Sequence, residues 1–324
     1  MNNDLSSYFE DPEFKEALEK YEGMVKNHTP AYFDADELTD IAEYYASKGR
    51  QIEAEAAIDF ALQLHPNDTD ALIFRARSLA MKGRLDEAYM VMDLIEDRSD
   101  REVRFLKADL LMEEKRMEEA NHVFEELAAY EEGKLETLID IILAYIDANQ
   151  EALAKKWIKH VGETYDLASL SQKNQKFRDL LCDFYITFNN PEAAIPLLQA
   201  TLDCYPYSIN HWNSLGKCYL STNDYEEAHE AIDFALAIDD SNAEALTLKA
   251  FCYQQSGELQ KSCDYYLRLA EQQENKTRAY LALAKTYFEM QDYTSSIYYI
   301  EALLDNKDAL SKYELSELYG DIAL

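Results

Sequence analysis

The chain contains little glycine or proline and no segment that would serve as a flexible linker. Of its 324 residues only 8 are glycine and 6 are proline, and no stretch is rich in Pro, Gly and Ser. Runs of alternating β-branched residues are scarce, whereas Ala, Leu, Glu, Lys and Gln abound, and these residues favour helices. The composition therefore predicts an all-α protein.

Cationic residues are also few. The chain has 31 Lys and Arg against 63 Asp and Glu, which gives a formal net charge of -32. Such a surface repels phosphate backbones and anionic lipid headgroups, so the composition argues against nucleic acid and membrane partners. The acidity has two interpretations: it keeps the surface soluble, or it attracts basic ligands.

Long apolar runs are missing as well. No 18 consecutive residues are apolar, and the best stretch, residues 138–146, is interrupted by Asp140. Residues 1–12 carry acids and no apolar core, unlike a signal or transit peptide. We therefore expect a cytoplasmic protein without a membrane span.

Cysteine and histidine do not cluster. None of the 5 cysteines forms a CxxC motif, and Cys218 and Cys252, 34 residues apart, are expected to face inward as small packing residues. The 6 histidines are at least 18 residues apart and offer no HxxxH pair to a metal. Gly-rich phosphate loops and nucleophile motifs are absent, and acid pairs such as Glu118 with Glu119 are typical of solvated helix faces. The sequence therefore predicts no catalytic residues, metal or cofactor, and no enzyme activity.

What the chain does contain is an internal repeat. Four tyrosines stand 34 residues apart, and the series continues upstream at spacings of 40, 34, 32 and 34. A repeat of this length indicates a solenoid of stacked helical units that bury apolar surface against their neighbours. The reference positions of the repeat are Tyr45, Leu79, Leu111, Tyr145, Tyr185, Tyr219, Tyr253 and Tyr287.

Other positions repeat in phase with the reference position. Small residues three positions before it and nine after it would let two antiparallel helices cross closely, and a large residue thirteen positions after it would fill the space beside the crossing. Four positions after it, a residue able to adopt the left-handed conformation ends the first helix of each pair. These residues are Gly49, Gly83, Asn149, Asn189, Asn223 and Gly257, whereas the third unit has Lys115.

This pattern resembles the tetratricopeptide repeat family. The resemblance implies an α-solenoid, a right-handed superhelix of about eight helix-turn-helix repeats, and a role in binding proteins. Arg75, Lys107 and Lys249 depart from it because they occupy a position that is usually apolar, and their units are expected to stack less regularly. The sixth unit carries the pattern most fully, with Trp212, Leu215, Gly216, Tyr219, Ala228, Ile232 and Ala235.

The repeat divides the chain into four predicted segments. Residues 1–34 form an N-terminal capping helix and linker, 35–174 four repeats, 175–310 four more, and 311–324 a C-terminal capping helix. Residues 162–176 lengthen the step between the fourth and fifth units as a longer helix end or a loop, and act either as a hinge or as an inert insertion. The terminal helices could also form a homodimer contact.

In this family the first helix of each pair lines a concave groove, so the resemblance implies a binding stripe along the first helices. The stripe lies nine, six and two residues before the reference position and one after it, along one side of a helix. Its apolar residues either form a groove floor or pack against the neighbouring first helix, and its mostly acidic polar residues suit an amphipathic segment with basic residues. The predicted groove residues are Ile73, Arg77, Phe105, Asp109, Met112, Ile139, Leu143, Ile146, Asp183, Ile186, Asn213 and Lys217.

The family's carboxylate clamp is incomplete. Asn213 and Lys217 suit it, but the next unit offers Glu244 and Phe251 where further Asn, Lys and Arg are needed. We expect a non-catalytic scaffold that binds peptide or helix segments of partner proteins. The alternatives are a peptide-responsive regulator, although the residues before the array are too few and too acidic for a DNA-binding motif, and an accessory subunit of an enzyme complex.

Overall fold

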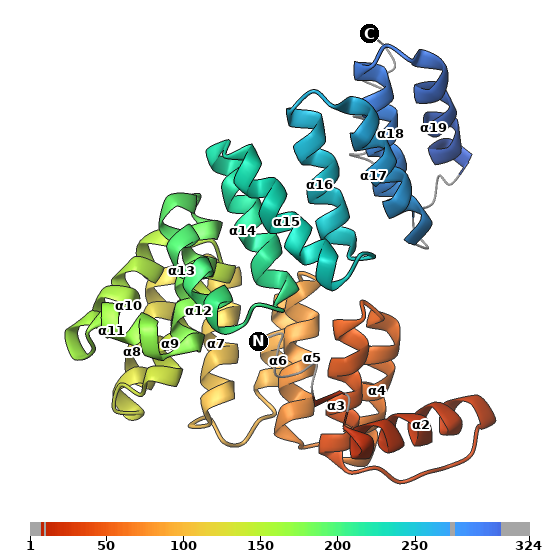
Figure 1. The fold of residues 1–324 in the computed structure, drawn as a ribbon. Coiled ribbons are helices and arrows are strands. Elements are labelled where there is room, and N and C mark those ends of the chain that lie inside the picture. The colour runs from red at the N-terminus through yellow and green to blue at the C-terminus, as the bar shows by residue number, and fades with distance from the viewer. Residues whose placement is uncertain (1–7, 10, 273–275, 306–324) are drawn as a thin grey trace. The chain divides into compact units, whose positions relative to one another are not determined.

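The computed structural model describes residues 8–9, 11–272 and 276–305. Within these residues the chain forms helices and no strand, which confirms the all-α class. The chain divides into two compact units, residues 1–144 and 145–324, and each is described by itself (Figure 1). The predicted boundaries between groups of repeats stay predictions.

The first unit holds the N-terminal helix and the first helix pairs. First helices α3 and α5, and likewise α5 and α7, contact each other, and each of the three packs on the second helix that follows it. The helices are α2 (Pro12–Asn27), α3 (Ala35–Ser47), α4 (Gln51–Leu64), α5 (Thr69–Met81), α6 (Leu85–Met92), α7 (Arg101–Glu113), α8 (Met117–Tyr130) and α9 (Leu135–Asp147), whose last residues belong to the second unit.

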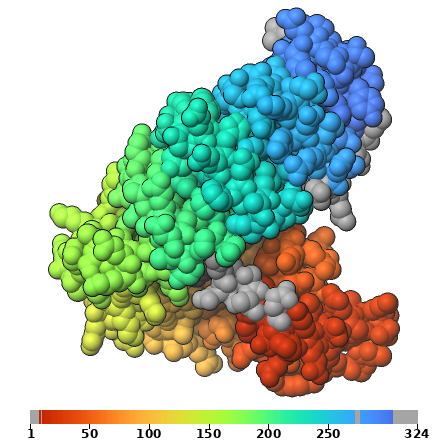
Figure 2. All heavy atoms as spheres, viewed as in Figure 1, coloured from red at the N-terminus to blue at the C-terminus, as the bar shows by residue number. Residues whose placement is uncertain are grey.

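The second unit repeats the same plan, and Figure 2 shows the atoms of its successive helices in continuous contact. Every first helix in the described chain contains one reference position, so the eight predicted pairs are present. The helices are α10 (Glu151–Thr164), α11 (Leu167–Lys173), α12 (Gln175–Thr187), α13 (Pro191–Cys204), α14 (Ile209–Thr222), α15 (Tyr225–Ile238), α16 (Ala243–Gln255), α17 (Leu259–Gln272), α18 (Thr277–Glu289) and α19 (Tyr293–Asp305).

The turn inside each pair has one backbone geometry throughout. Four residues after each reference position φ lies between 54° and 79°, and this holds for Lys115 and Gln291 as well as for the predicted Gly and Asn residues. The N–H of the following residue donates to the carbonyl of the reference position at 2.7–3.0 Å in all eight turns. This bond satisfies a carbonyl that the end of the helix would otherwise leave unpaired.

The small residues at the helix crossings are buried as predicted. Ala42 and Ala54 have no exposed surface, and Ser296 donates its hydroxyl to the carbonyl of Ala284 at 2.9 Å across the crossing of α18 and α19. At Gly216 an added Cβ would lie 2.8 Å from Ile232 Cγ1, closer than side chains normally approach. Close helix approach therefore explains the small residues.

Cations at the usually apolar position have a shared structural reason. Lys249 on α16 is 3% exposed and pairs with Asp233 on α15 at 2.6 Å, and Arg75 on α5 pairs with Asp59 on α4. Asp59 and Asp233 both lie fourteen residues after a reference position, so the two ion pairs repeat in register. Each joins a second helix to the first helix of the next pair.

The N-terminal helix begins where the sequence predicts it. Asp11 accepts a hydrogen bond from the Glu13 N–H at 2.8 Å, and Pro12 is the first residue of α2. Phe14 and Tyr21 are buried in the core cluster that also contains residues of α3 and α4. This helix therefore covers the first pair. The predicted C-terminal helix, 311–324, lies outside the described residues.

Residues 162–176 contain a separate short helix, α11, which the sequence analysis did not predict. Arg178 on α12 is buried, and its guanidinium donates to Thr201 Oγ1 at 2.8 Å and to the carbonyls of Ser171 at 3.2 Å and Gln172 at 3.3 Å. These bonds tie the end of α11 to α12 and α13. The hinge interpretation of this segment stays a prediction.

Candidate functional site

The first helices of the first unit carry a group of exposed or partly exposed carboxylates. Asp36, Asp40 and Glu43 project from α3, Asp70 begins the side of α5, and Glu102 lies in the first turn of α7. We call these five residues the acidic face. Asp40 also accepts a hydrogen bond from the Tyr8 hydroxyl at 2.5 Å.

Crowding of like charges raises carboxyl pKa values on the acidic face. The pKa of Glu43 is raised by partial burial and then by Asp40, while Arg77 acts in the opposite direction. The pKa of Asp70 is raised by partial burial and by nearby acids, among them Asp36. Burial likewise raises the pKa of Asp40. The folded protein therefore holds these carboxylates in surroundings that disfavour their charged form.

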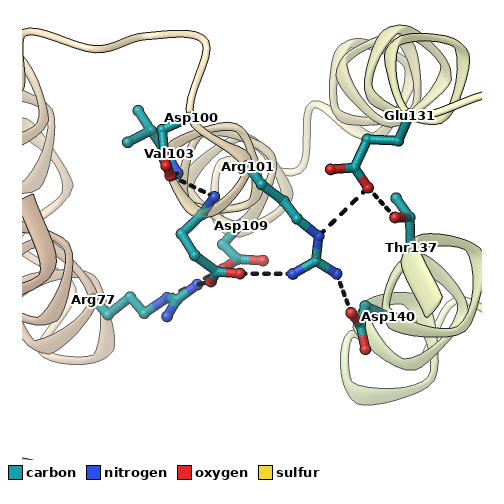
Figure 3. A network of polar contacts seen from close by, with 9 residues as sticks. Arg77, Asp100, Arg101, Val103, Asp109, Glu131, Thr137 and Asp140 are labelled. Atoms are coloured by element: carbon teal, nitrogen blue, oxygen red, sulfur yellow. Dashed lines mark hydrogen bonds and ion pairs between the residues drawn. The ribbon is translucent and has the colours of Figure 1, made fainter. Parts of the chain in front are cut away.

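Two arginines cross the acidic face and are held by several acids (Figure 3). Arg77 lies 3.4 Å from Glu102 and 3.6 Å from Asp109. Arg101 lies 2.9 Å from Glu102 and also pairs with Asp140 of α9. These contacts link α5, α7 and α9, and they satisfy both guanidinium groups within the protein.

The apolar residues predicted as a groove floor lie inside the first-helix packing. Phe105 contacts the ring of Phe124 on α8 with centroids 5.3 Å apart, and the Arg101 guanidinium lies over its other side at 5.0 Å. Of the two interpretations open from the sequence, packing against neighbouring helices describes these residues. Their exposed fractions are 5–7%, for Ile73, Phe105, Met112, Ile139 and Ile146.

The other predicted groove residues keep more surface, apart from Asn213. Leu143 and Ile186 are partly exposed, and Asp183 is exposed. The pKa of Asp183 is raised by burial and by the charge of Asp179, against the opposing effect of His211. No comparison tests a binding role for the twelve residues, so that role stays a prediction.

Asn213 is fixed between α14 and α16. Its amide nitrogen donates to Asn242 Oδ1 at 3.1 Å and to Glu244 Oε2 at 3.0 Å, and Lys217 also pairs with Glu244. Both acceptors lie on one side, so the amide oxygen of Asn213 points the other way, where it has no protein donor among the described residues. Because Glu244 holds Lys217, the two residues that suited a carboxylate clamp are engaged within the protein.

His211 forms a contact that the sequence analysis missed. Its Nδ1 lies 2.6 Å from the Ser208 hydroxyl and its Nε2 lies 3.3 Å from Asp179. Asp179 is 32 residues away, on α12, so only the stacking of first helices brings the two together. The signal available in the sequence was the stripe itself, since Asp179 lies six residues before Tyr185.

The last pairs of the second unit expose aromatic side chains on the first helices. Phe251 on α16 is 41% exposed and Phe288 on α18 is 48% exposed. Arg278 and Lys285 on α18 are exposed beside them in sequence. This part of the stripe is thus apolar and cationic, unlike the acidic face of the first unit.

Neither metal ligands nor a membrane span emerge from the part of the chain that the structure describes. No three His, Cys, Asp or Glu side chains there converge as metal ligands do. No helix in those ranges is both long and apolar enough to cross a bilayer. Cys182, Cys218 and Cys252 are buried, and burial raises the thiol pKa of Cys182 to about 12 and of the other two to about 11. These thiols are packing residues.

Comparison with known proteins yields one family and several similar proteins. The model of the tetratricopeptide repeat matches residues 39–89, 185–243 and 213–277. The formate-dependent nitrite reductase complex subunit NrfG of Escherichia coli O157:H7 is 26% identical over 191 residues, which cover 57% of this chain and 89% of that protein.

Solved structures with a similar arrangement of helices share little sequence. A tetratricopeptide repeat protein from Parabacteroides merdae ATCC 43184 is 16% identical, with a TM-score of 0.49, over 78% of this chain and 98% of that one. MamA is 18% identical, with a TM-score of 0.43, over 51% of this chain and 92% of that one.

Proposed function

Because this chain is a tetratricopeptide repeat protein, we propose that it is an interaction scaffold whose acidic face binds partner segments bearing basic residues. The observation that supports this proposal is the set of crowded carboxylates with raised pKa values on α3 and α5. A bound cation would relieve the repulsion among Asp40, Glu43 and Asp70. Electrostatic attraction also steers the encounter and sets its sensitivity to salt.

The burial of the apolar residues changes what kind of binding is expected. Ile73, Phe105 and Ile139 are 5–7% exposed and offer a partner almost no area. Apolar contacts would have to come from partly exposed residues such as Leu143. Binding on the acidic face is therefore expected to depend mainly on charge and to weaken strongly as salt rises.

A pair of synthetic amphipathic helices tests this proposal. One contains Lys and Leu, the other Glu and Leu in the same pattern, and each is labelled for fluorescence anisotropy. We expect the Lys peptide to bind the full chain and the variant Glu43→Gln with Asp70→Asn to lose about fivefold in affinity, because each exposed ion pair contributes up to about 1 kcal/mol.

A charge-matched variant provides the control. Asp86 and Glu118 are exposed on the second helices α6 and α8, away from the stripe, so Asp86→Asn with Glu118→Gln removes the same net charge. This control should bind the Lys peptide as the unchanged chain does. Equal losses in both variants would mean that net charge alone attracts the peptide, and the acidic face would not be the site.

A second candidate function is that of a non-catalytic subunit in an enzyme complex. The similarity to NrfG, a subunit of a formate-dependent nitrite reductase complex, supports it. In this case the acidic face would hold a segment of the catalytic subunit in the cytoplasm, without a cofactor on this chain. Cross-linking in the native cell followed by mass spectrometry should then recover the same oxidoreductase chain in every preparation. Recovery of unrelated chains only would refute this candidate.

A further inference from the structure

The first helices α16 and α18 carry a binding stripe whose charge is opposite to that of the acidic face. Phe251 is 41% exposed and Phe288 is 48% exposed, whereas the apolar stripe residues of the first unit are 5–7% exposed. Phe288 also contacts the ring of Tyr293, itself 54% exposed, with centroids 5.5 Å apart. Exposed aromatic groups of this kind are typical of interfaces.

The register of the stack brings these aromatic residues beside cations. Lys217 reaches Glu244 on the next first helix, and Arg77 reaches Glu102 in the same relation, so the stripe residue two before a reference position lies beside the residue nine before the next one. The same relation places Phe251 opposite Arg278 of α18.

A second contact fixes the far end of this stripe. Gln254 on α16 donates to Glu289 on α18 at 2.8 Å, which brings the helix turn after Phe251 against the turn that carries Phe288. Lys285 lies one turn before Phe288 on the same side of α18. The four residues Phe251, Arg278, Lys285 and Phe288 thus form one continuous surface, which we call the cationic aromatic stripe.

We propose that the cationic aromatic stripe docks an amphipathic acidic segment of a partner protein. Carboxylates of the segment would face Arg278 and Lys285, and its apolar residues would cover Phe251 and Phe288. Charge complementarity selects this occupant, because two cations stand together here in a chain of net charge -32. The stripe is separate from the acidic face, so the scaffold would join two partners of opposite charge.

The Glu peptide of the pair described above is the probe. We expect it to bind the full chain and to lose about tenfold in affinity when Arg278→Glu and Lys285→Glu are combined, because two attractions become two repulsions. The variant Phe251→Ser with Phe288→Ser should also weaken the Glu peptide. Both phenylalanines are exposed, so circular dichroism should remain that of the unchanged chain.

The controls separate this proposal from the acidic face. Lys159→Glu with Lys173→Glu makes the same charge change at exposed lysines of α10 and α11 and should leave Glu peptide affinity unchanged. The variant Glu43→Gln with Asp70→Asn should weaken the Lys peptide only.

Three results would overturn the proposal. The first is equal affinity of the Glu peptide for the unchanged chain and for Arg278→Glu with Lys285→Glu. The second is tighter binding of a single-stranded oligonucleotide than of the Glu peptide, competing at the same residues. The third is a smaller particle in light scattering for that charge-reversed variant without peptide, which would assign the stripe to a second copy of the chain.

Discussion

Replacing Lys115 by glycine should stabilise the third helix pair. Lys115 has φ of 64°, a left-handed conformation that costs an L residue with a side chain roughly 1–2 kcal/mol. The bonds of the turn are backbone bonds: the Lys115 N–H donates to Met112 at 2.9 Å, and the Arg116 N–H donates to Leu111 at 2.9 Å. Glycine removes the strain and keeps both bonds. Its greater freedom in the unfolded chain offsets about 0.4–1 kcal/mol of that gain.

The net stabilisation should be about 0.5–1 kcal/mol, measured as a higher urea midpoint with an unchanged slope in circular dichroism. Gln291→Gly should act in the same direction, since Gln291 has φ of 61° in the equivalent turn. The matched control is Lys107→Gly, the same substitution at an exposed position inside α7, which should cost about 1 kcal/mol. If Lys115→Gly lowered the midpoint as Lys107→Gly does, the assignment of strain to the turn would be wrong.

Three further predictions concern buried and crowded groups. Asp233→Ala should lower the free energy of unfolding by about 2 kcal/mol because it leaves the buried Lys249 ammonium without its carboxylate, and Lys249→Met added to it should restore most of the loss in urea titrations. Phe105→Ala should cost about 3 kcal/mol, whereas Phe251→Ala should cost less than about 0.5 kcal/mol, since the first ring is 7% exposed and the second 41%; similar costs would contradict the burial of Phe105. The raised pKa of Asp70 means that the folded state binds protons more readily than the unfolded state, so stability should rise as pH falls from neutral toward the ordinary carboxyl range. Asp70→Asn should reduce that rise, and an unchanged pH profile of the urea midpoint would refute this reasoning.

Much of the fold follows from the spacing of residues along the chain. The reference positions, the small residues at the crossings and the Gly and Asn residues of the turns all depend on contacts within one helix pair. Such contacts recur with the period of the repeat, so the sequence displays them directly. Gly216 is an example, because its closeness to Ile232 could be expected from the sixteen residues that separate them.

The candidate site was less accessible from the sequence. Ile73, Phe105 and Ile139 lie in the predicted stripe, yet whether an apolar residue there is covered depends on the sizes of side chains on neighbouring helices. Phe105 is covered by Phe124 from its own pair and by Arg101 from its own helix, a combination that no periodic pattern contains. Glu43 occupies the same stripe position as Arg77, but a search for apolar stripe residues passed over it.

The sequence alone determined the class of the fold, the eight helix pairs and their turns, and the cap that starts α2, because each rests on local backbone preferences and on a repeated spacing. Only the tertiary structure decided which stripe residues remain exposed, where carboxylates crowd enough to raise their pKa values, and how Lys249 is neutralised. Those properties depend on distances between residues of different helices, and a distance across a stack is set by packing.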